Sequence, residues 1–123
     1  MVLFSIIESA AHPTFSNLYS ELGFKEVQFS SVRKAIQALK RQPPDIVLAD
    51  FLYGYGNNYA GVNISNLDVF LYSLEKYAPD CQVIAFYEKS EREYITQFEA
   101  LFPKVTCLVY PIQESQLKSL LSK

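Results

Sequence analysis

The chain has 123 residues, of which 50% are hydrophobic and 20% charged, a balance typical of an ordinary globular protein. Eleven basic and thirteen acidic residues leave a net charge of −2, without the clusters of Lys and Arg that binding to nucleic acid requires. No segment reaches the roughly 18 consecutive apolar residues of a membrane helix, so we expect one cytoplasmic domain over residues 1–123 that binds neither nucleic acid nor membrane.

Short apolar runs alternate with helical periodicity in the first half of the chain. Residues 1–7 form an almost continuous apolar run, as in a strand that is buried on both faces. After this run, apolar residues recur at helical spacing up to Gly23. They then alternate with polar residues at 25–29, and after Ser31 they recur at helical spacing again. The predicted elements are a strand at 1–7, a helix from Pro13 to Gly23, a strand at 25–29, and a helix with Ser31 as N-cap that runs to Leu39.

The second half repeats this alternation after one unusual segment. Residues Phe51 to Asn63 follow neither period and contain three of the four glycines, which predicts a long loop. The other predicted elements are a strand at 46–50, a helix capped by Ser65 and closed by Pro79, a strand at 83–87, a helix at 90–102, a strand at 105–110 and a short C-terminal helix.

Five strands that alternate with five helices predict an α/β fold. Right-handed crossovers would make the strands parallel and place helices on both faces of the sheet. At this chain length we expect a three-layer, flavodoxin-like, doubly wound sandwich with a five-stranded parallel sheet in the order 2-1-3-4-5.

The functional residues of such a fold gather at the carboxyl ends of its strands. The predicted first, third, fourth and fifth strands end at Glu8, Asp50, Tyr87 and Tyr110, respectively. Because neighbouring parallel strands deliver side chains to the same edge, we expect Tyr87 and Tyr110 to converge over Asp50. His12 stands alone in the sequence and is interpreted as a cap or surface residue.

The order of these segments resembles the receiver domain of bacterial response regulators. The segment 44–50, Pro-Asp-Ile-Val-Leu-Ala-Asp, is similar to the third strand that carries the family's phospho-accepting aspartate. Three further features support the resemblance: the acid Glu8, the segment 79–84 that leads into the fourth strand, and Tyr110-Pro111 in place of Lys-Pro. The resemblance implies that Asp50 occupies the phospho-acceptor position.

Several departures from the family pattern indicate a degenerate variant. Receivers hold Mg²⁺ with an acidic pair after the first strand, whereas this chain has Glu8 alone, so we expect Glu8 and Asp50 to bind Mg²⁺ weakly or not at all. Tyr87 replaces the family's hydroxyl residue, Cys107 the switch aromatic, and Tyr110 the lysine that neutralises the phosphoryl group. Because phosphoryl transfer depends on positioned charge, these changes predict a pseudo-receiver.

The leading hypothesis is therefore a non-catalytic signalling or interaction module of a bacterial two-component-type pathway, not an enzyme, that works without phosphorylation. One alternative is a receiver that is still phosphorylated at Asp50. A second is a small-molecule binder that takes a flavin or nucleotide at the carboxyl edge of the sheet.

The expected partner is a second copy of the chain or another protein. It would bind the face of the fourth helix, fifth strand and fifth helix, near Ser90–Phe102 and Lys104–Lys123, or the Tyr53–Tyr59 segment. Tyr53, Tyr55 and Tyr59 give that segment the composition of a recognition loop.

Overall fold

The computed structural model describes residues 1–12, 14–53 and 65–122. The strands are β1 (Val2–Ile6), β2 (Lys25–Phe29), β3 (Ile46–Asp50), β4 (Gln82–Tyr87) and β5 (Thr106–Val109). The helices are α1 (Ser16–Glu21), α2 (Val32–Leu39), α3 (Asp68–Tyr77), α4 (Arg92–Leu101) and α5 (Glu114–Leu121), with a short 3₁₀ helix, Lys89–Glu91, before α4.

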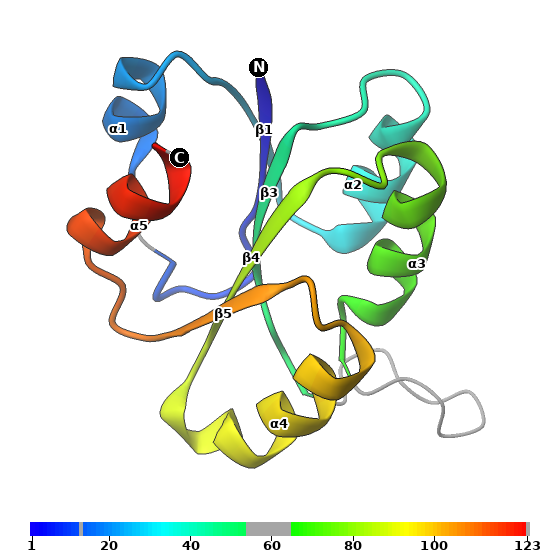
Figure 1. The fold of residues 1–123 in the computed structure, drawn as a ribbon, viewed down its shortest axis with the longest axis vertical. Helices are drawn as coiled ribbons and strands as arrows, with labels where there is room; N and C mark the ends of the chain where they lie inside the picture. Colours follow the sequence, from blue (N-terminus) through cyan, green and yellow to red (C-terminus); the bar gives the residue numbers. More distant parts are fainter. Residues whose placement is uncertain (13, 54–64, 123) are drawn as a thin grey trace.

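The five strands form one parallel sheet in the order β2-β1-β3-β4-β5 (Figure 1). This confirms the predicted fold class and strand order. The boundaries of β2 are those expected from the sequence, and the turn after α1 contains Gly23, whose φ of 86° is the left-handed conformation that favours glycine. Pro13, the expected first residue of the first helix, lies outside the described residues.

Two core clusters pack on opposite faces of the sheet because successive strand side chains alternate between the faces. Val47 and Ala49 of β3 belong to the cluster that α2, α3 and α4 cover. Ile46 and Leu48 belong to the cluster that α1 and α5 cover (Figure 1). Asp50 has the parity of the second pair and therefore projects toward the α1 and α5 side at the carboxyl edge.

The central position of β3 explains why its last residue is buried. Every residue of β3 is buried, as a strand flanked by β1 and β4 and covered on both faces must be. Asp50 is only 1% exposed. A carboxylate at this depth needs hydrogen-bond donors from the protein, because an unpaired buried charge is strongly destabilising.

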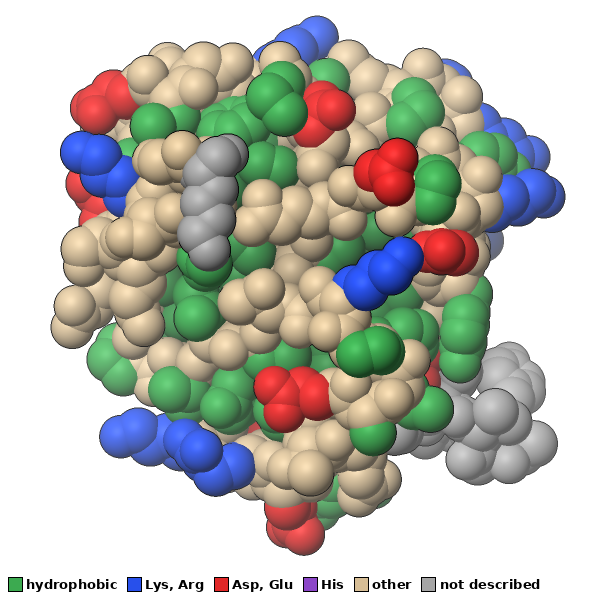
Figure 2. All heavy atoms as spheres, viewed as in Figure 1, with side chains coloured by type: hydrophobic (Ala, Val, Ile, Leu, Met, Phe, Trp, Pro, Cys, Tyr) green, Lys and Arg blue, Asp and Glu red, His purple; other side chains and the backbone are tan. Residues whose placement is uncertain are grey.

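The surface contains charged residues of both signs. On the face shown in Figure 2, Lys and Arg side chains are interspersed with Asp and Glu. Within the described ranges, no helix combines the length and apolar character needed to cross a membrane.

Candidate functional site

Asp50 is the centre of the candidate site at the carboxyl edge. Its strand lies between β1 and β4, and its register partner on β4 is Phe86. The residues that contact its carboxylate come from the segments that follow β1 and β5. This is the edge at which doubly wound folds place their functional groups.

Four donor groups of the protein surround the Asp50 carboxylate. The backbone N–H groups of Glu8 and Ser9 both donate to Oδ2, each at 2.9 Å. His12 Nδ1 lies 3.0 Å from Oδ1, and the Tyr110 hydroxyl donates to the same oxygen. Both carboxylate oxygens thus have two partners within the chain, and the side chain that carries them is almost fully buried.

His12 is part of this site, so its interpretation as a cap or surface residue was wrong. Its side chain is 1% exposed and its ring lies 5.1 Å from that of Phe86. A tight turn brings it there: the His12 N–H donates to the Ser9 carbonyl oxygen at 3.1 Å. The available sequence signal was its place as the only histidine, four residues after Glu8.

The surroundings of Asp50 favour its charged form. Burial alone would raise the pKa of the carboxyl group, but the hydrogen bond and charge of His12, with the Tyr110 and Ser9 hydrogen bonds, hold it below its ordinary value. The pKa of the Tyr110 phenol is raised, first by burial and then by the hydrogen bond and charge of Asp50. The pair is therefore an ionised carboxylate and a neutral phenol.

Glu8 is held beside Asp50 by an asparagine that the sequence interpretation missed. The Asn66 side-chain amide donates to Glu8 Oε1 at 2.7 Å and to the Asp50 carbonyl oxygen at 2.8 Å, and its oxygen accepts the Leu52 N–H at 2.8 Å. Burial raises the pKa of Glu8 despite this hydrogen bond. Asn66 follows the segment outside the described residues and belongs to no sequence motif, so only its position reveals this role.

Tyr87 does not converge on Asp50, so this part of the prediction was wrong. The register sets Asp50 level with Phe86, one residue earlier on β4. Tyr87 therefore points to the opposite face and is buried in the cluster under α2, α3 and α4. Tyr110 lies over Asp50 as predicted.

Cys107 also lies on the side of the sheet away from Asp50. It pairs with Ala85 and packs against the same cluster as Tyr87. Burial, with a smaller contribution from Glu99, raises the pKa of its thiol to about 12. The position that resembles the family's switch is thus occupied here by a protonated, half-buried thiol.

The predicted recognition loop is described only at its first tyrosine. Tyr53 forms an isolated antiparallel bridge with Ser65, and its ring stacks on that of Tyr94 at 3.5 Å between centroids. It is 49% exposed. Tyr55 and Tyr59 lie outside the described residues.

The donor set around Asp50 does not suit Mg²⁺. That ion requires about six oxygen ligands in octahedral geometry, whereas N–H and O–H donors and an imidazole point at this carboxylate. In the part of the chain that the structure describes, no three His, Cys, Asp or Glu residues are grouped to hold a metal ion. Glu8 and Asp50 would have to exchange their present partners to bind one.

Comparison with known proteins places this site in the receiver fold. No protein-family model matches the sequence, and no curated protein matches it. Among solved structures, a response regulator receiver protein from Sinorhizobium medicae WSM419 has a TM-score of 0.67 at 20% identity, over 98% of this chain and 92% of its own. A receiver domain protein from Clostridium thermocellum has a TM-score of 0.68 at 17% identity, over 98% and 89%.

A third similar structure is that of an enzyme. It is an adenylate cyclase from Rhodopirellula baltica, with a TM-score of 0.69 at 12% identity, over 98% of this chain and 83% of the other. Together these likenesses show that the chain has the flavodoxin-like fold of response regulator receiver domains.

Proposed function

We propose that this protein is a receiver-fold signalling module that acts by binding other protein chains and does not accept a phosphoryl group at Asp50. One observation supports this proposal above all: two backbone amides, His12 and Tyr110 engage both oxygens of the Asp50 carboxylate. The general role of the fold in two-component signalling supports the wider setting, a bacterial cytoplasmic pathway.

The chemistry of phosphorylation explains why the occupied carboxylate matters. A carboxylate oxygen must attack phosphorus in line with the leaving group, and the developing charge needs nearby cations. Attack by Oδ1 would require His12 and Tyr110 to withdraw and would leave the ionised carboxylate with fewer buried partners. Tyr110 offers a neutral hydroxyl where the resembled family has a lysine.

No catalytic role is proposed for the described residues. The adenylate cyclase shares the fold with this chain at 12% identity, a likeness that extends to no particular catalytic residue. Asp50, the central carboxylate of the site, is buried and has both oxygens engaged, so it is poorly placed to act as a nucleophile or a base. The place of Asp50 at the end of β3 in a receiver fold favours the alternative of a phospho-accepting receiver. The third hypothesis, a binder of flavin or nucleotide, is supported by no contact of the described residues.

Treatment with acetyl phosphate and Mg²⁺ tests the proposal. Phosphate-affinity electrophoresis and intact mass would be measured for the wild-type chain and for Asp50→Asn, beside an ordinary receiver as positive control. We expect the wild type and the variant to remain unmodified while the control is labelled. A mass increase of the wild type that Asp50→Asn abolishes would overturn the proposal and favour the phospho-accepting alternative.

A further inference from the structure

The sheet ends at β2, whose outer side has no neighbouring strand among the described residues. The Lys25 N–H donates to a carbonyl oxygen just before β1 at 2.8 Å, and the Phe29 carbonyl oxygen accepts an N–H just after β1 at 2.9 Å. Because backbone groups alternate in direction along a strand, those of Glu26 and Gln28 are directed outward. The edge therefore presents N–H and C=O groups with which another polypeptide strand can pair.

A shallow hollow of about 420 Å³ lies beside this edge, between β2 and α2. Its lining residues are Val27 and Phe29 of β2, Ala38 of α2, and Arg41 and Gln42 just after that helix. Val27 and Phe29 are only partly buried against the core cluster that α2 covers. A strand added beside β2 would therefore find room here for an apolar side chain.

The surface of α2 around the hollow is positively charged. Lys34 lies one turn before Ala38 and Arg41 one turn after it, so both bases are on the side of α2 that borders the hollow. The exposed residues of α2 and its C-cap include no acid: they are Arg33, Lys34, Gln37 and Lys40. Among the residues that the structure describes, no acid forms an ion pair with these bases or with Arg41.

The acids of the same stretch of chain are engaged elsewhere. Residues 25–45 contain five bases and two acids, whereas the rest of the chain contains six bases and eleven acids. Glu26 accepts a hydrogen bond from the Ser16 hydroxyl of α1 at 2.6 Å, on the other face of the sheet. Asp45 accepts a backbone N–H of β1 at 2.8 Å. The positive surface beside β2 is therefore a local feature of a chain whose net charge is negative.

From these observations we infer that the β2 edge binds an extended acidic segment of another protein, which adds to the sheet as a strand. The outward backbone groups of Glu26 and Gln28 pair with its main chain, and the hollow takes an apolar side chain. Its carboxylates lie against the bases of α2, whose charge is complementary. A polypeptide fits this edge better than a lipid surface or a nucleic acid, because only a polypeptide supplies peptide groups in the spacing of a strand.

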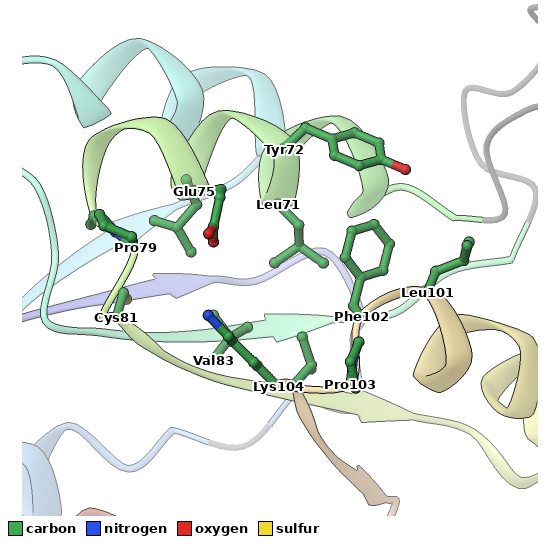
Figure 3. Close-up of a pocket in the computed structure, with 13 residues that line it drawn as sticks. Leu71, Tyr72, Glu75, Pro79, Cys81, Val83, Leu101, Phe102, Pro103 and Lys104 are labelled. Atoms are coloured by element: carbon green, nitrogen blue, oxygen red, sulfur yellow. The ribbon is translucent and has the colours of Figure 1, made fainter.

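Charge disfavours a second copy of the chain as the occupant. Antiparallel pairing of two β2 strands about a twofold axis perpendicular to the sheet brings both α2 helices to the same face, where bases oppose bases. The hollow between α3 and the α4–β5 connection offers no such selection, because Glu75 and Lys104 stand on its opposite sides (Figure 3). The β2 edge is thus the surface whose charge specifies one class of partner.

This surface gives the proposed interaction module a partner of defined chemistry, and in that respect the inference rests on the proposed function. It lies at the opposite edge of the sheet from β5, and so differs from the face of α4, β5 and α5 expected from the sequence. Since Asp50 contributes no contact to it, binding does not depend on modification of that residue.

A model peptide tests the charge complementarity. A fluorescein-labelled peptide of alternating Glu and Val, about eight residues long, has the usual length of a strand, and fluorescence anisotropy measures its dissociation constant. We expect Lys34→Glu and Arg41→Glu each to weaken binding at least about tenfold. Lys118→Glu, on α5, makes the same change of net charge and should leave the dissociation constant unchanged. All three residues are exposed, so the variants should remain folded, which circular dichroism checks.

Two changes test the strand pairing independently of charge. An N-methylated form of the peptide keeps its carboxylates but cannot donate backbone hydrogen bonds, and Gln28→Pro removes an N–H that β2 directs outward. We expect each to weaken binding at least about tenfold, with circular dichroism again checking the fold of the variant.

Several outcomes would overturn the inference. They are failure of the wild-type chain to bind the peptide, equal binding of the N-methylated form, and equal weakening by Lys118→Glu and Arg41→Glu. Tighter binding to phosphatidylserine vesicles or to a DNA duplex than to the peptide would also overturn it, as would self-association that Gln28→Pro abolishes. Because acetyl phosphate labelling is a separate measurement, failure of this inference and failure of the proposed function are distinguishable.

Discussion

The hydroxyl group of Tyr110 donates a hydrogen bond to Asp50 Oδ1 across 60 residues of sequence and from beyond the end of β5 to the end of β3. By the sequence resemblance to receiver domains, we propose that this phenol takes the place of the family's lysine. On that proposal, a neutral hydroxyl donor stands in place of a positive charge, and it stabilises the ionised carboxylate through the hydrogen bond.

Replacement of this donor should lower stability. We expect Tyr110→Phe to reduce the free energy of unfolding by about 2 kcal/mol, since hydrogen bonds to charged groups contribute about 1.5–3 kcal/mol. Urea denaturation measures the change. Tyr19→Phe is the matched control, because the buried Tyr19 hydroxyl has no hydrogen-bond partner among the described residues, and its removal should be neutral or stabilising. Equal losses in both variants would contradict the role of Tyr110.

The lowered pKa of Asp50 predicts a pH dependence with a definite sign. A carboxyl group whose pKa is depressed in the folded state stabilises the fold above its ordinary pKa of 3.8, and this stabilisation is lost as the pH falls through the lower folded-state pKa. The stability difference between the wild type and Asp50→Asn should therefore narrow in acid. Denaturation curves at a series of pH values measure it.

Glu8 should behave in the opposite way and is the control for this prediction. Its pKa is raised from 4.5, so ionisation of Glu8 costs stability as the pH rises above that value. Glu8→Gln should be at least as stable as the wild type at neutral pH and should lose this advantage in acid. If both substitutions changed stability in the same direction with pH, the assigned electrostatics would be wrong.

We expect Asn66 to contribute strongly to the stability of the fold, although no sequence motif marks it. Asn66→Ala leaves the Leu52 N–H and the Asp50 carbonyl oxygen without their side-chain partner, and we expect a loss of about 2–4 kcal/mol. Thermal and urea unfolding measure it. Gln28→Ala, which removes a single exposed hydrogen bond to Glu26, should change stability by less than about 0.5 kcal/mol. A small effect at Asn66 would contradict its bridging role.

Addition of Mg²⁺ should not stabilise the protein. A ligand present at about 100 times its dissociation constant stabilises the folded state by about 2.7 kcal/mol, an effect that is easily seen as a shift of melting temperature. Since the donors around Asp50 do not suit a cation, we expect no shift at millimolar Mg²⁺. A shift that Asp50→Asn removes would show that the carboxylate exchanges its partners for the metal.

The two cysteines should react slowly with thiol reagents. Burial raises the pKa of both thiols from 9.0 to about 12. A smaller contribution comes from Asp45 at Cys81 and from Glu99 at Cys107. At mildly alkaline pH the reactive thiolate is then about a thousandfold scarcer than in a free thiol. Kinetics of modification in the native and the urea-unfolded chain measure the difference. Equal rates in the two states would contradict the burial of these thiols.

The periodicity of the sequence alone determined the fold. Continuous apolar runs such as residues 46–49 are typical of central strands of a covered parallel sheet, and alternation with helical segments leaves few topologies. The same reasoning placed Glu8, Asp50 and Tyr110 at one edge, because parallel strands all end on the same side.

The contacts within the site were decided by the tertiary structure. A shift of one residue in register places Phe86 instead of Tyr87 beside Asp50, and periodicity does not determine register to that accuracy. His12 and Asn66 reach the site through a turn and a loop exit, 38 and 16 residues from Asp50 in the chain. Such polar contacts form because the buried carboxylate and backbone groups require partners, and only the folded arrangement determines which side chains supply them.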